Sequence, residues 1–451
     1  SGPRPAQRQS HLILEMFHRA FLLGLLGLSA GVDAFSPASL PAHPSIRSAS
    51  STGSCQVSMQ DPSSAGLSSE TPFLLDNMGR AQPPVDNEGR RRVTLGGAVL
   101  AAGAVLPKGA SAEAVKTPVT FDSIDNDLPC AKVLTGMWQL SGGHGYKPDK
   151  TKAIKAMKES VEKGFTTFDL ADHYGDAEPI TSLFRTKYPE LWRESQFYTK
   201  WVPMPGPMPR EVVERAVDRR LKRMGTEKLD LLQFHWWDYE TRDQYLEAMG
   251  HMQDMVNEGK IGHLAVTNFD TRNFKASRDA GINLVSNQVQ FSLIDQRPLQ
   301  KMAPYCVDND LKLLAYGTVC GGFLSDEYVG KAKLSRQDFD TASKGKYYNM
   351  IEMWGGWPLF QDLLATLKQI GDKHGVSVTN VATRWAIEQP AVAGAIVGAR
   401  LGLTDHTDSN LKVFTFQLDD DDKAKIAAVT AKSNDLMKVV GDCGDEYRRR
   451  G

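Results

Sequence analysis

From Lys132 onward, short runs rich in β-branched and aromatic residues alternate with longer segments whose apolar residues recur every three or four positions. The first pattern predicts strands and the second predicts amphipathic helices. Strands that alternate with helices build a parallel sheet, because parallel neighbours need a long crossover connection. The alternation therefore favours an α/β fold.

The number of strand candidates narrows this prediction to one architecture. Eight are present, which is the number that closes a (β/α)8 TIM barrel, at 132–134, 167–170, 196–198, 229–234, 263–266, 284–287, 312–315 and 395–397. Helices are predicted between them at 151–163, 209–224, 242–258 and 359–374. The aromatic, Gly-rich connection 321–358 is expected either to cover the barrel mouth or to pack on the barrel wall. We expect a single catalytic domain over residues 115–451.

Residues 1–114 are rich in Ser, Pro, Gly and Ala, and we predict that they form a targeting leader. Residues 16–34 join a short basic region to an apolar run too short to span a bilayer, as in a signal peptide. Residues 35–89 resemble a transit segment. Residues 90–112 resemble a twin-arginine thylakoid signal, or else end the transit segment. The expected location is the plastid (chloroplast), with the thylakoid lumen or the stroma as destination.

The charge balance and the cysteines limit the partners. Lys and Arg number 53 against 54 Asp and Glu, so neither nucleic acid nor an anionic membrane is an expected partner. The 5 cysteines show no C-x-x-C spacing, which argues against a zinc site and a disulfide framework, and we expect no metal. A small molecule is the expected partner of a domain that does not span a membrane, and the oligomeric state is open.

Polar residues stand where the predicted strands end. In barrel enzymes the carboxyl ends of the strands form one mouth, where the active site lies. Each residue taken singly has an ordinary structural role as a helix cap or a core group, but together they predict a site. In chain order they are Asp169, Lys200, His235, Thr267, Asn268, Gln288, Tyr316 and Arg400.

Several of these segments resemble the aldo-keto reductase family. Phe168-Asp-Leu-Ala-Asp-His-Tyr174-Gly-Asp-Ala-Glu178 is similar to the family signature. Tyr198-Thr-Lys200 and Leu229-Asp-Leu-Leu-Gln-Phe-His235 are similar to the segments that bear its lysine and histidine. The resemblance extends over residues 130–420 in the family's order, and with the leader it suggests a plastid-targeted member.

The resemblance implies an NAD(P)H-dependent oxidoreductase that reduces an aldehyde or ketone to an alcohol by hydride transfer. Tyr174 would be the general acid, and Lys200 would lower the pKa of its phenol. Asp169 would hold Lys200, and His235 would hydrogen-bond the substrate oxygen. The alternative is a non-catalytic nucleotide-binding barrel that acts as a redox sensor or as a subunit of a plastid membrane complex.

The resemblance also implies a cofactor site for NADPH, with NADH as the alternative because His406 replaces a usual Arg. Tyr316 would stack on the nicotinamide ring, and Asn410 would contact the adenine. The remaining cofactor contacts would come from Gly136 and Met137, from Thr267, Asn268 and Gln288 at the carboxamide, and from Arg400 and His406 at the 2′-phosphate. Trp138 and Trp236 are expected to line the substrate pocket.

Overall fold

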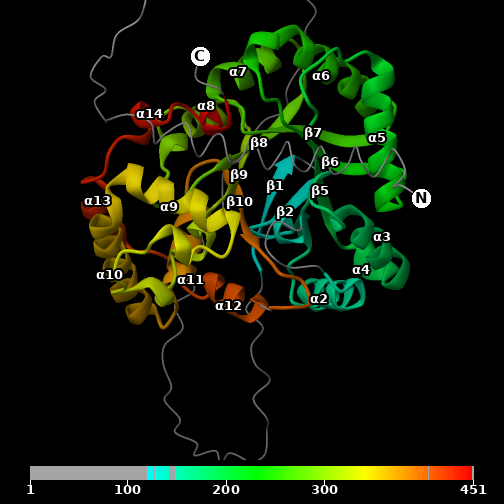
Figure 1. Ribbon diagram of the computed structural model, residues 1–451. Coiled ribbons are helices and arrows are strands. Elements are labelled where there is room, and N and C mark those ends of the chain that lie inside the picture. Colours follow the sequence, from blue (N-terminus) through cyan, green and yellow to red (C-terminus); the bar gives the residue numbers. More distant parts are fainter. Residues whose placement is uncertain (1–118, 126, 142–147, 405, 449–451) are drawn as a thin grey trace, which may run out of the picture. The chain divides into compact units, whose positions relative to one another are not determined.

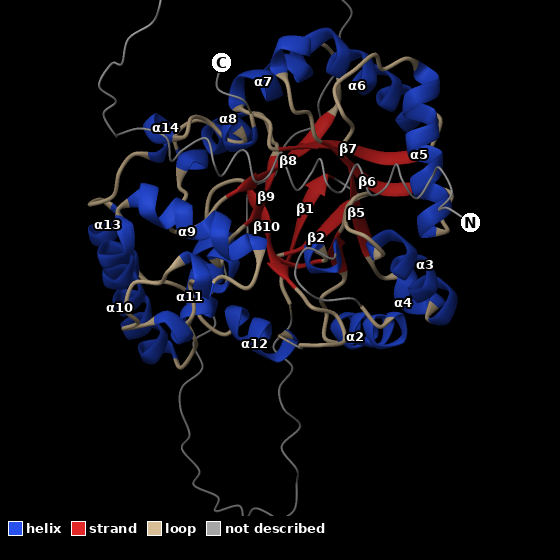
Figure 2. Ribbon diagram, viewed as in Figure 1, coloured by secondary structure: helices blue, strands red, loops and turns tan. Residues whose placement is uncertain are grey.

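The computed structural model describes residues 119–125, 127–141, 148–404 and 406–448. The leader predicted for residues 1–114, with its signal-peptide, transit and twin-arginine segments, lies outside the described residues. Within them, eight parallel strands close into a barrel in the order β10-β3-β4-β5-β6-β7-β8-β9. Helices surround this barrel (Figures 1 and 2). The predicted (β/α)8 TIM barrel is confirmed.

Each of the eight predicted strands overlaps an observed one. The barrel strands are β3 (Val133–Gly136), β4 (Thr167–Asp169), β5 (Gln196–Trp201), β6 (Leu229–Phe234), β7 (Ile261–Thr267), β8 (Leu284–Gln290), β9 (Lys312–Tyr316) and β10 (Val392–Gly398). Several run further toward their carboxyl ends than the prediction did, because polar residues that face the mouth still belong to the ladder. Lys200 pairs with Gln233 in this way, and Thr267 pairs with Gln288.

The four predicted helices are present with ends shifted by at most three residues, as α2 (Lys150–Glu162), α5 (Arg210–Met224), α6 (Arg242–Asn257) and α10 (Gly356–His374). Left-handed glycines, Gly225 and Gly375, end α5 and α10. The other helices are α3 (Ala177–Lys187), α4 (Pro189–Arg193), α7 (Thr271–Asp279), α8 (Met302–Asp308), α9 (Ala342–Trp354), α11 (Val378–Ile387), α12 (Thr407–Leu411), α13 (Asp420–Thr430) and α14 (Leu436–Val439).

An antiparallel hairpin that the sequence did not reveal closes one end of the barrel. Its strands are β1 (Phe121–Asp125) and β2 (Leu128–Ala131). Ile124 and Leu128 join an apolar cluster inside the barrel with Tyr198 and Leu231, each of which stands two residues before a polar mouth residue. Alternation along a strand puts such pairs on one face. The apolar layer and the hairpin therefore lie at the amino end, opposite the mouth.

The connection 321–358 both packs on the barrel wall and reaches the barrel mouth, which were expected as alternatives. It contains α9, whose Tyr347, Tyr348 and Trp354 are buried in the core. Gly317, with φ of 71°, has room for the Tyr347 hydroxyl only because it lacks a Cβ, which would lie 2.4 Å from that oxygen. The neighbouring Lys346 reaches the mouth, where it faces Tyr316. One face of α9 thus belongs to the wall and its first turns belong to the mouth.

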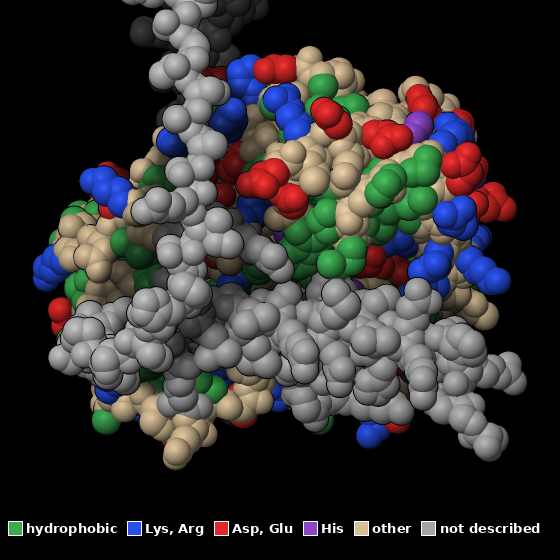
Figure 3. Space-filling view, turned by 45° about the horizontal axis from the view of Figure 1, so that its top comes forward, with side chains coloured by type: hydrophobic (Ala, Val, Ile, Leu, Met, Phe, Trp, Pro, Cys, Tyr) green, Lys and Arg blue, Asp and Glu red, His purple; other side chains and the backbone are tan. Residues whose placement is uncertain are grey.

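The surface carries charges of both signs, and the described cysteines form no disulfide. Basic and acidic side chains are interspersed over the face that Figure 3 displays. Cys130, Cys306, Cys320 and Cys443 are buried free thiols. Among the helices of the described residues, none has the length and apolar character needed to cross a membrane.

Candidate active site at the barrel mouth

A buried ion pair forms the centre of the site. Lys200 at the end of β5 donates from Nζ to both carboxylate oxygens of Asp169, at 2.7 Å each, and to the Leu170 carbonyl at 3.0 Å. Both partners are only 3% exposed. Burial lowers the pKa of Lys200, and the carboxylate opposes that shift. All three N–H groups of the ammonium are therefore used inside the protein.

Tyr174 lies beside this pair, with its ring centroid 5.0 Å from Lys200 Nζ. Burial and the Asp169 carboxylate raise the pKa of the Tyr174 phenol well above its ordinary value. The lowering expected from Lys200 does not outweigh these two effects, because the ammonium faces the ring and its protons go to Asp169 and Leu170. Trp138 packs edge-to-face on Tyr174 with centroids 4.9 Å apart, as a wall residue should.

His235 is a buried, neutral imidazole. Burial and the nearby Arg448 lower its pKa to about 3. Its Nδ1 lies 3.2 Å from the Thr267 carbonyl and 3.4 Å from Asn268 Nδ2. A carbonyl only accepts and an amide nitrogen only donates, so these contacts favour opposite tautomers. Nε2 is buried without a hydrogen-bond partner in the described chain, which leaves it free for a ligand.

Two glutamines link the ion pair to the next strands. Gln288 Nε2 donates to Asp169 Oδ1 at 2.7 Å and to Gln233 Oε1 at 2.8 Å. Gln233 Nε2 also donates to Asp169 Oδ1, at 3.2 Å. Sequence reasoning missed Gln233, although it stands two residues before His235 and so shares its strand face. In this arrangement Gln288, expected at a carboxamide, is bonded within the protein.

The ends of β7 and β9 bring three more predicted residues together. Thr267 Oγ1 donates to the Gln288 carbonyl at 3.1 Å. Asn268 follows with φ of 58°, a left-handed conformation that Asn tolerates better than most residues. Tyr316 Oη donates to Asn268 Oδ1 at 2.8 Å. These amide and hydroxyl groups form a polar surface of the kind that a carboxamide needs.

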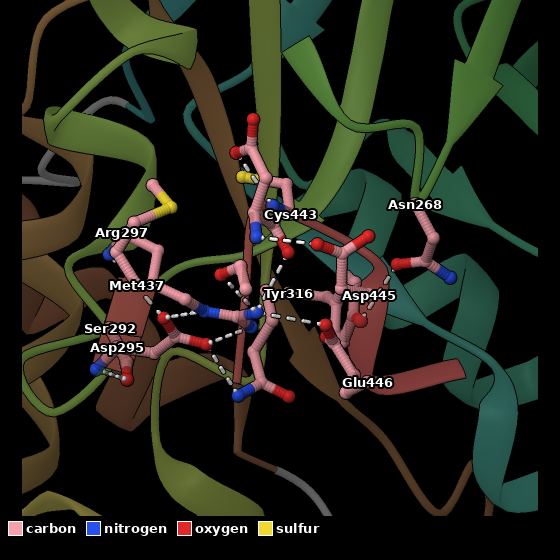
Figure 4. A network of polar contacts seen from close by, with 12 residues as sticks. Asn268, Ser292, Asp295, Arg297, Tyr316, Met437, Cys443, Asp445 and Glu446 are labelled. Atoms are coloured by element: carbon pink, nitrogen blue, oxygen red, sulfur yellow. Dashed lines mark hydrogen bonds and ion pairs between the residues drawn. The ribbon is translucent and has the colours of Figure 1, made fainter. Parts of the chain in front are cut away.

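The C-terminal segment Asp442–Arg448 enters the mouth and was not predicted as part of the site. Tyr447 Oη lies 3.1 Å from Tyr316 Oη, and the ring centroids of Tyr447 and His235 are 6.0 Å apart. Arg297 holds this segment through Glu446 at 3.0 Å and the Asp442 carbonyl at 3.0 Å, while pairing with Asp295 (Figure 4). The segment is thus a fixed part of the mouth.

The other predicted residues lie around this cluster or apart from it. Gly136 ends β3 at a place where a Cβ would lie 2.7 Å from Ile396 Cγ2, and Met137 N donates to the Asp169 carbonyl at 2.9 Å. Arg400 and the exposed His406 follow β10, and Asn410 lies in α12. The described contacts join none of these last three side chains to the Asp169–Lys200 pair.

Trp236 does not line the mouth as expected. It is completely buried between Phe234 and Tyr245, and its indole nitrogen donates to the Asp238 carbonyl at 2.6 Å. Successive residues that leave a strand alternate in direction, so the next tryptophan turns the other way. Trp237 packs edge-to-face on His235 with ring centroids 4.3 Å apart.

The fold and this cluster define a class: a (β/α)8-barrel protein whose buried titratable residues converge at the carboxyl ends of the strands. The sequence matches the Aldo/keto reductase family over residues 132–431, and the chain belongs to that family. The family comprises oxidoreductases that generally reduce carbonyl compounds with NAD(P)H.

Individual relatives are distant. The chain is 24% identical to the aldo-keto reductase YhdN of Bacillus subtilis over 294 residues, which cover 61% of this chain and 83% of that protein. It is 33% identical over 179 residues to the flagellar radial spoke protein 5 of Chlamydomonas reinhardtii, a match that covers 36% of this chain and 34% of that protein.

Two solved structures have the same fold. The glycerol dehydrogenase AKR11B4 of Gluconobacter oxydans superposes with a TM-score of 0.58 at 21% identity, covering 73% of this chain and 97% of that one. An aldo-keto reductase of Klebsiella pneumoniae in complex with NADPH superposes with a TM-score of 0.52 at 19% identity, covering 70% and 95%. At such identities the likeness concerns the fold alone.

Proposed function

We propose that the protein reduces an aldehyde or ketone to an alcohol with NADPH, and that Tyr174 donates the proton to the carbonyl oxygen. The observation that carries this proposal is the convergence of Asp169, Tyr174, Lys200 and His235 in one buried cluster at the barrel mouth. Bound NADPH would supply the hydride. The protein would supply the acid and the fixed geometry.

Each residue of the cluster has a role that its environment supports. The raised pKa leaves Tyr174 protonated at neutral pH but makes it a weaker acid than a free phenol, so proton transfer relies on stabilisation of the phenolate. Neutral His235 offers Nε2, and in the tautomer that Asn268 favours this atom donates to the substrate oxygen. Asp169 fixes Lys200 beside the Tyr174 ring, where its charge steadies the phenolate left after proton transfer.

The polar surface of Thr267, Asn268 and Tyr316 fits a nicotinamide carboxamide and ring. Gln288 joins it by exchanging its bond to Asp169. Arg400, His406 and Asn410 would hold the adenosine 2′-phosphate end, where Arg offers paired donors. Membership of a family that generally uses NAD(P)H supports a nicotinamide cofactor, and the exposed His406 leaves NADH as the alternative to NADPH.

The test is NADPH oxidation over a panel of aldehydes and ketones, with Tyr174→Phe as the variant. Tyr305→Phe is the matched control, because Tyr305 lies on α8 and its hydroxyl makes no hydrogen bond in the described chain. Turnover that Tyr305→Phe keeps and Tyr174→Phe loses supports the proposal. Equal turnover in wild type and Tyr174→Phe refutes it.

A non-catalytic role as a nucleotide-binding subunit is the second candidate. It is favoured by the similarity to a radial spoke protein, whose name denotes a component of a flagellar assembly. A protein that binds NADPH, turns over no carbonyl on the panel and binds equally well as Tyr174→Phe would fit this candidate. Its partners would then be sought by size-exclusion chromatography of native extracts.

We further propose a plastid location on the basis of residues 16–112. The twin-arginine pattern favours the thylakoid lumen, whereas a supply of NADPH favours the stroma. A protein loaded with cofactor before export reconciles the two, since that route carries folded proteins. Fractionation of isolated plastids decides between the compartments, and absence from plastids contradicts the proposal.

A further inference from the structure

Lys346 places a second ammonium in the mouth, apart from Lys200. It lies in α9, and its Nζ is 5.0 Å from the ring centroid of Tyr316, 5.3 Å from that of Tyr347 and 4.7 Å from that of Tyr447. It donates a hydrogen bond to the Tyr447 hydroxyl. A cation held among three aromatic faces is attracted by them but is not neutralised.

No carboxylate of the described chain lies within ion-pair distance of Lys346. The nearby Glu446 feels its charge, but Glu446 is bonded to Arg297 at 3.0 Å. Asp295 is likewise committed to Arg297, at 2.8 Å. Arg297 carries one positive charge against these two carboxylates, so their excess negative charge offsets Lys346 at longer range. Within ion-pair distance, however, Lys346 has no counter-ion among the described residues. Lys200, by contrast, is paired with Asp169.

Hydrogen bonds carry this polarity toward the expected nicotinamide site. Asn268 Oδ1 can only accept, so the proton of Tyr316 points to it. The proton between the two phenols must then come from Tyr447, whose oxygen accepts from Lys346. In this chain of hydrogen bonds each donor points away from Lys346 and toward Asn268. Hydrogen bonds aligned in one direction polarise one another, so the chain extends the positive potential of Lys346 toward the surface that would bind the nicotinamide ring.

We propose that Lys346 is a specificity-determining residue for the redox state of the cofactor, favouring reduced over oxidised nicotinamide. This inference rests on the proposed function, which places the nicotinamide at Tyr316 and Asn268. The two forms differ there by one positive charge, since the oxidised ring is cationic and the reduced ring is neutral. A nearby ammonium with no carboxylate within ion-pair distance repels only the cationic form. Product NADP+ would thereby leave more readily.

The experiment measures the dissociation constants of NADPH and NADP+ by titration calorimetry, without carbonyl substrate. The variant is Lys346→Met, which keeps the side-chain length and removes the charge. Lys344→Met is the matched control, because Lys344 lies on the same helix but pairs with Asp340 at 3.1 Å and faces Tyr328. Lys346→Arg restores the charge, and Lys346→Gln replaces Lys346→Met if that variant does not fold.

We expect Lys346→Met to lower the ratio of the NADP+ constant to the NADPH constant by roughly three- to tenfold, chiefly by tighter NADP+ binding. Lys346→Arg and Lys344→Met should keep the wild-type ratio. An unchanged ratio in Lys346→Met, or equal weakening of both forms as for a phosphate contact, overturns the inference while leaving the proposed function intact. A wild-type protein that binds neither form contradicts the proposed function itself.

Discussion

Arg448 donates a hydrogen bond of 2.6 Å to the backbone carbonyl of Asn268, 180 residues earlier in the chain. The same guanidinium packs 3.8 Å from the ring centroid of Tyr239. The C-terminal segment is thus bonded to the residue that should hold the nicotinamide carboxamide. A change that detaches the C-terminal segment should therefore also disturb Asn268 and the proposed cofactor site.

Arg297→Met should detach this segment and destabilise the protein. The substitution leaves Asp295 and Glu446 buried without their cation, and breaking a buried pair in this way costs about 3–5 kcal/mol. Denaturant unfolding measures the change. Arg193→Met, which breaks an exposed pair with Glu190, should cost under about 1 kcal/mol, and equal losses in both variants would contradict the role of Arg297.

Tyr174→Phe should lower kcat by roughly 10²–10⁴-fold, because the variant keeps the ring but has no proton to give. Titration calorimetry should show NADPH affinity within about threefold of wild type, since the hydroxyl is not among the proposed cofactor contacts. A large loss of affinity with kcat preserved would assign Tyr174 to binding instead of proton transfer.

Lys200→Met should destabilise the fold by about 3–5 kcal/mol, because Asp169 would remain as a buried carboxylate without its cation. The double variant Asp169→Asn with Lys200→Met should recover much of that stability while remaining inactive. Thermal unfolding and turnover of the single and double variants check both points. No recovery in the double variant would show that packing, not charge, dominates this site.

Stability should fall in acid through His235. Its pKa is about 3 in the folded protein against an ordinary value of 6.5. Between these values the unfolded chain binds a proton that the folded chain does not, so stability is full above pH 6.5 and declines as the pH falls toward 3. The slope from this residue is about 1.4 kcal/mol per pH unit. Unfolding of His235→Asn from pH 6 to 4 should be less steep by that amount, and parallel curves would contradict the shift.

Substitution of Trp236 should lower stability, whereas substitution of Trp237 should alter substrate binding. Trp236→Leu removes a completely buried ring and should cost about 3 kcal/mol of stability with KM little changed. Trp237→Leu alters the contact with His235 and should change KM for carbonyl substrates with little effect on unfolding. The opposite pattern would return Trp236 to the substrate site.

The strand ends were predictable because each polar residue follows a short apolar run, and barrel closure brings such ends together. Asp169, Lys200 and His235 were found in this way, and the direction of the Tyr174 pKa was not. That direction depends on which neighbours accept the protons of Lys200, and small differences in distance decide which neighbours these are. Sequence order carries no such information.

The remaining misses have a common cause. Lys346, Glu446 and Tyr447 reach the mouth from segments that follow no barrel strand directly, so no periodicity marks them. The hairpin β1–β2 was missed because Asp122, Ser123 and Asp125 interrupt its apolar pattern. Trp236 and Trp237 were separable only by the alternation of direction after β6.

The hairpin and the C-terminal segment give the two ends of the barrel different tolerances to engineering. An affinity tag or fluorescent fusion joined directly after Arg448 would begin beside a residue that is bonded to Asn268. Such a fusion would tether a foreign polypeptide at the barrel mouth. Recombinant protein for kinetic work should therefore carry its purification handle ahead of Val119, on the side of the sealed amino end.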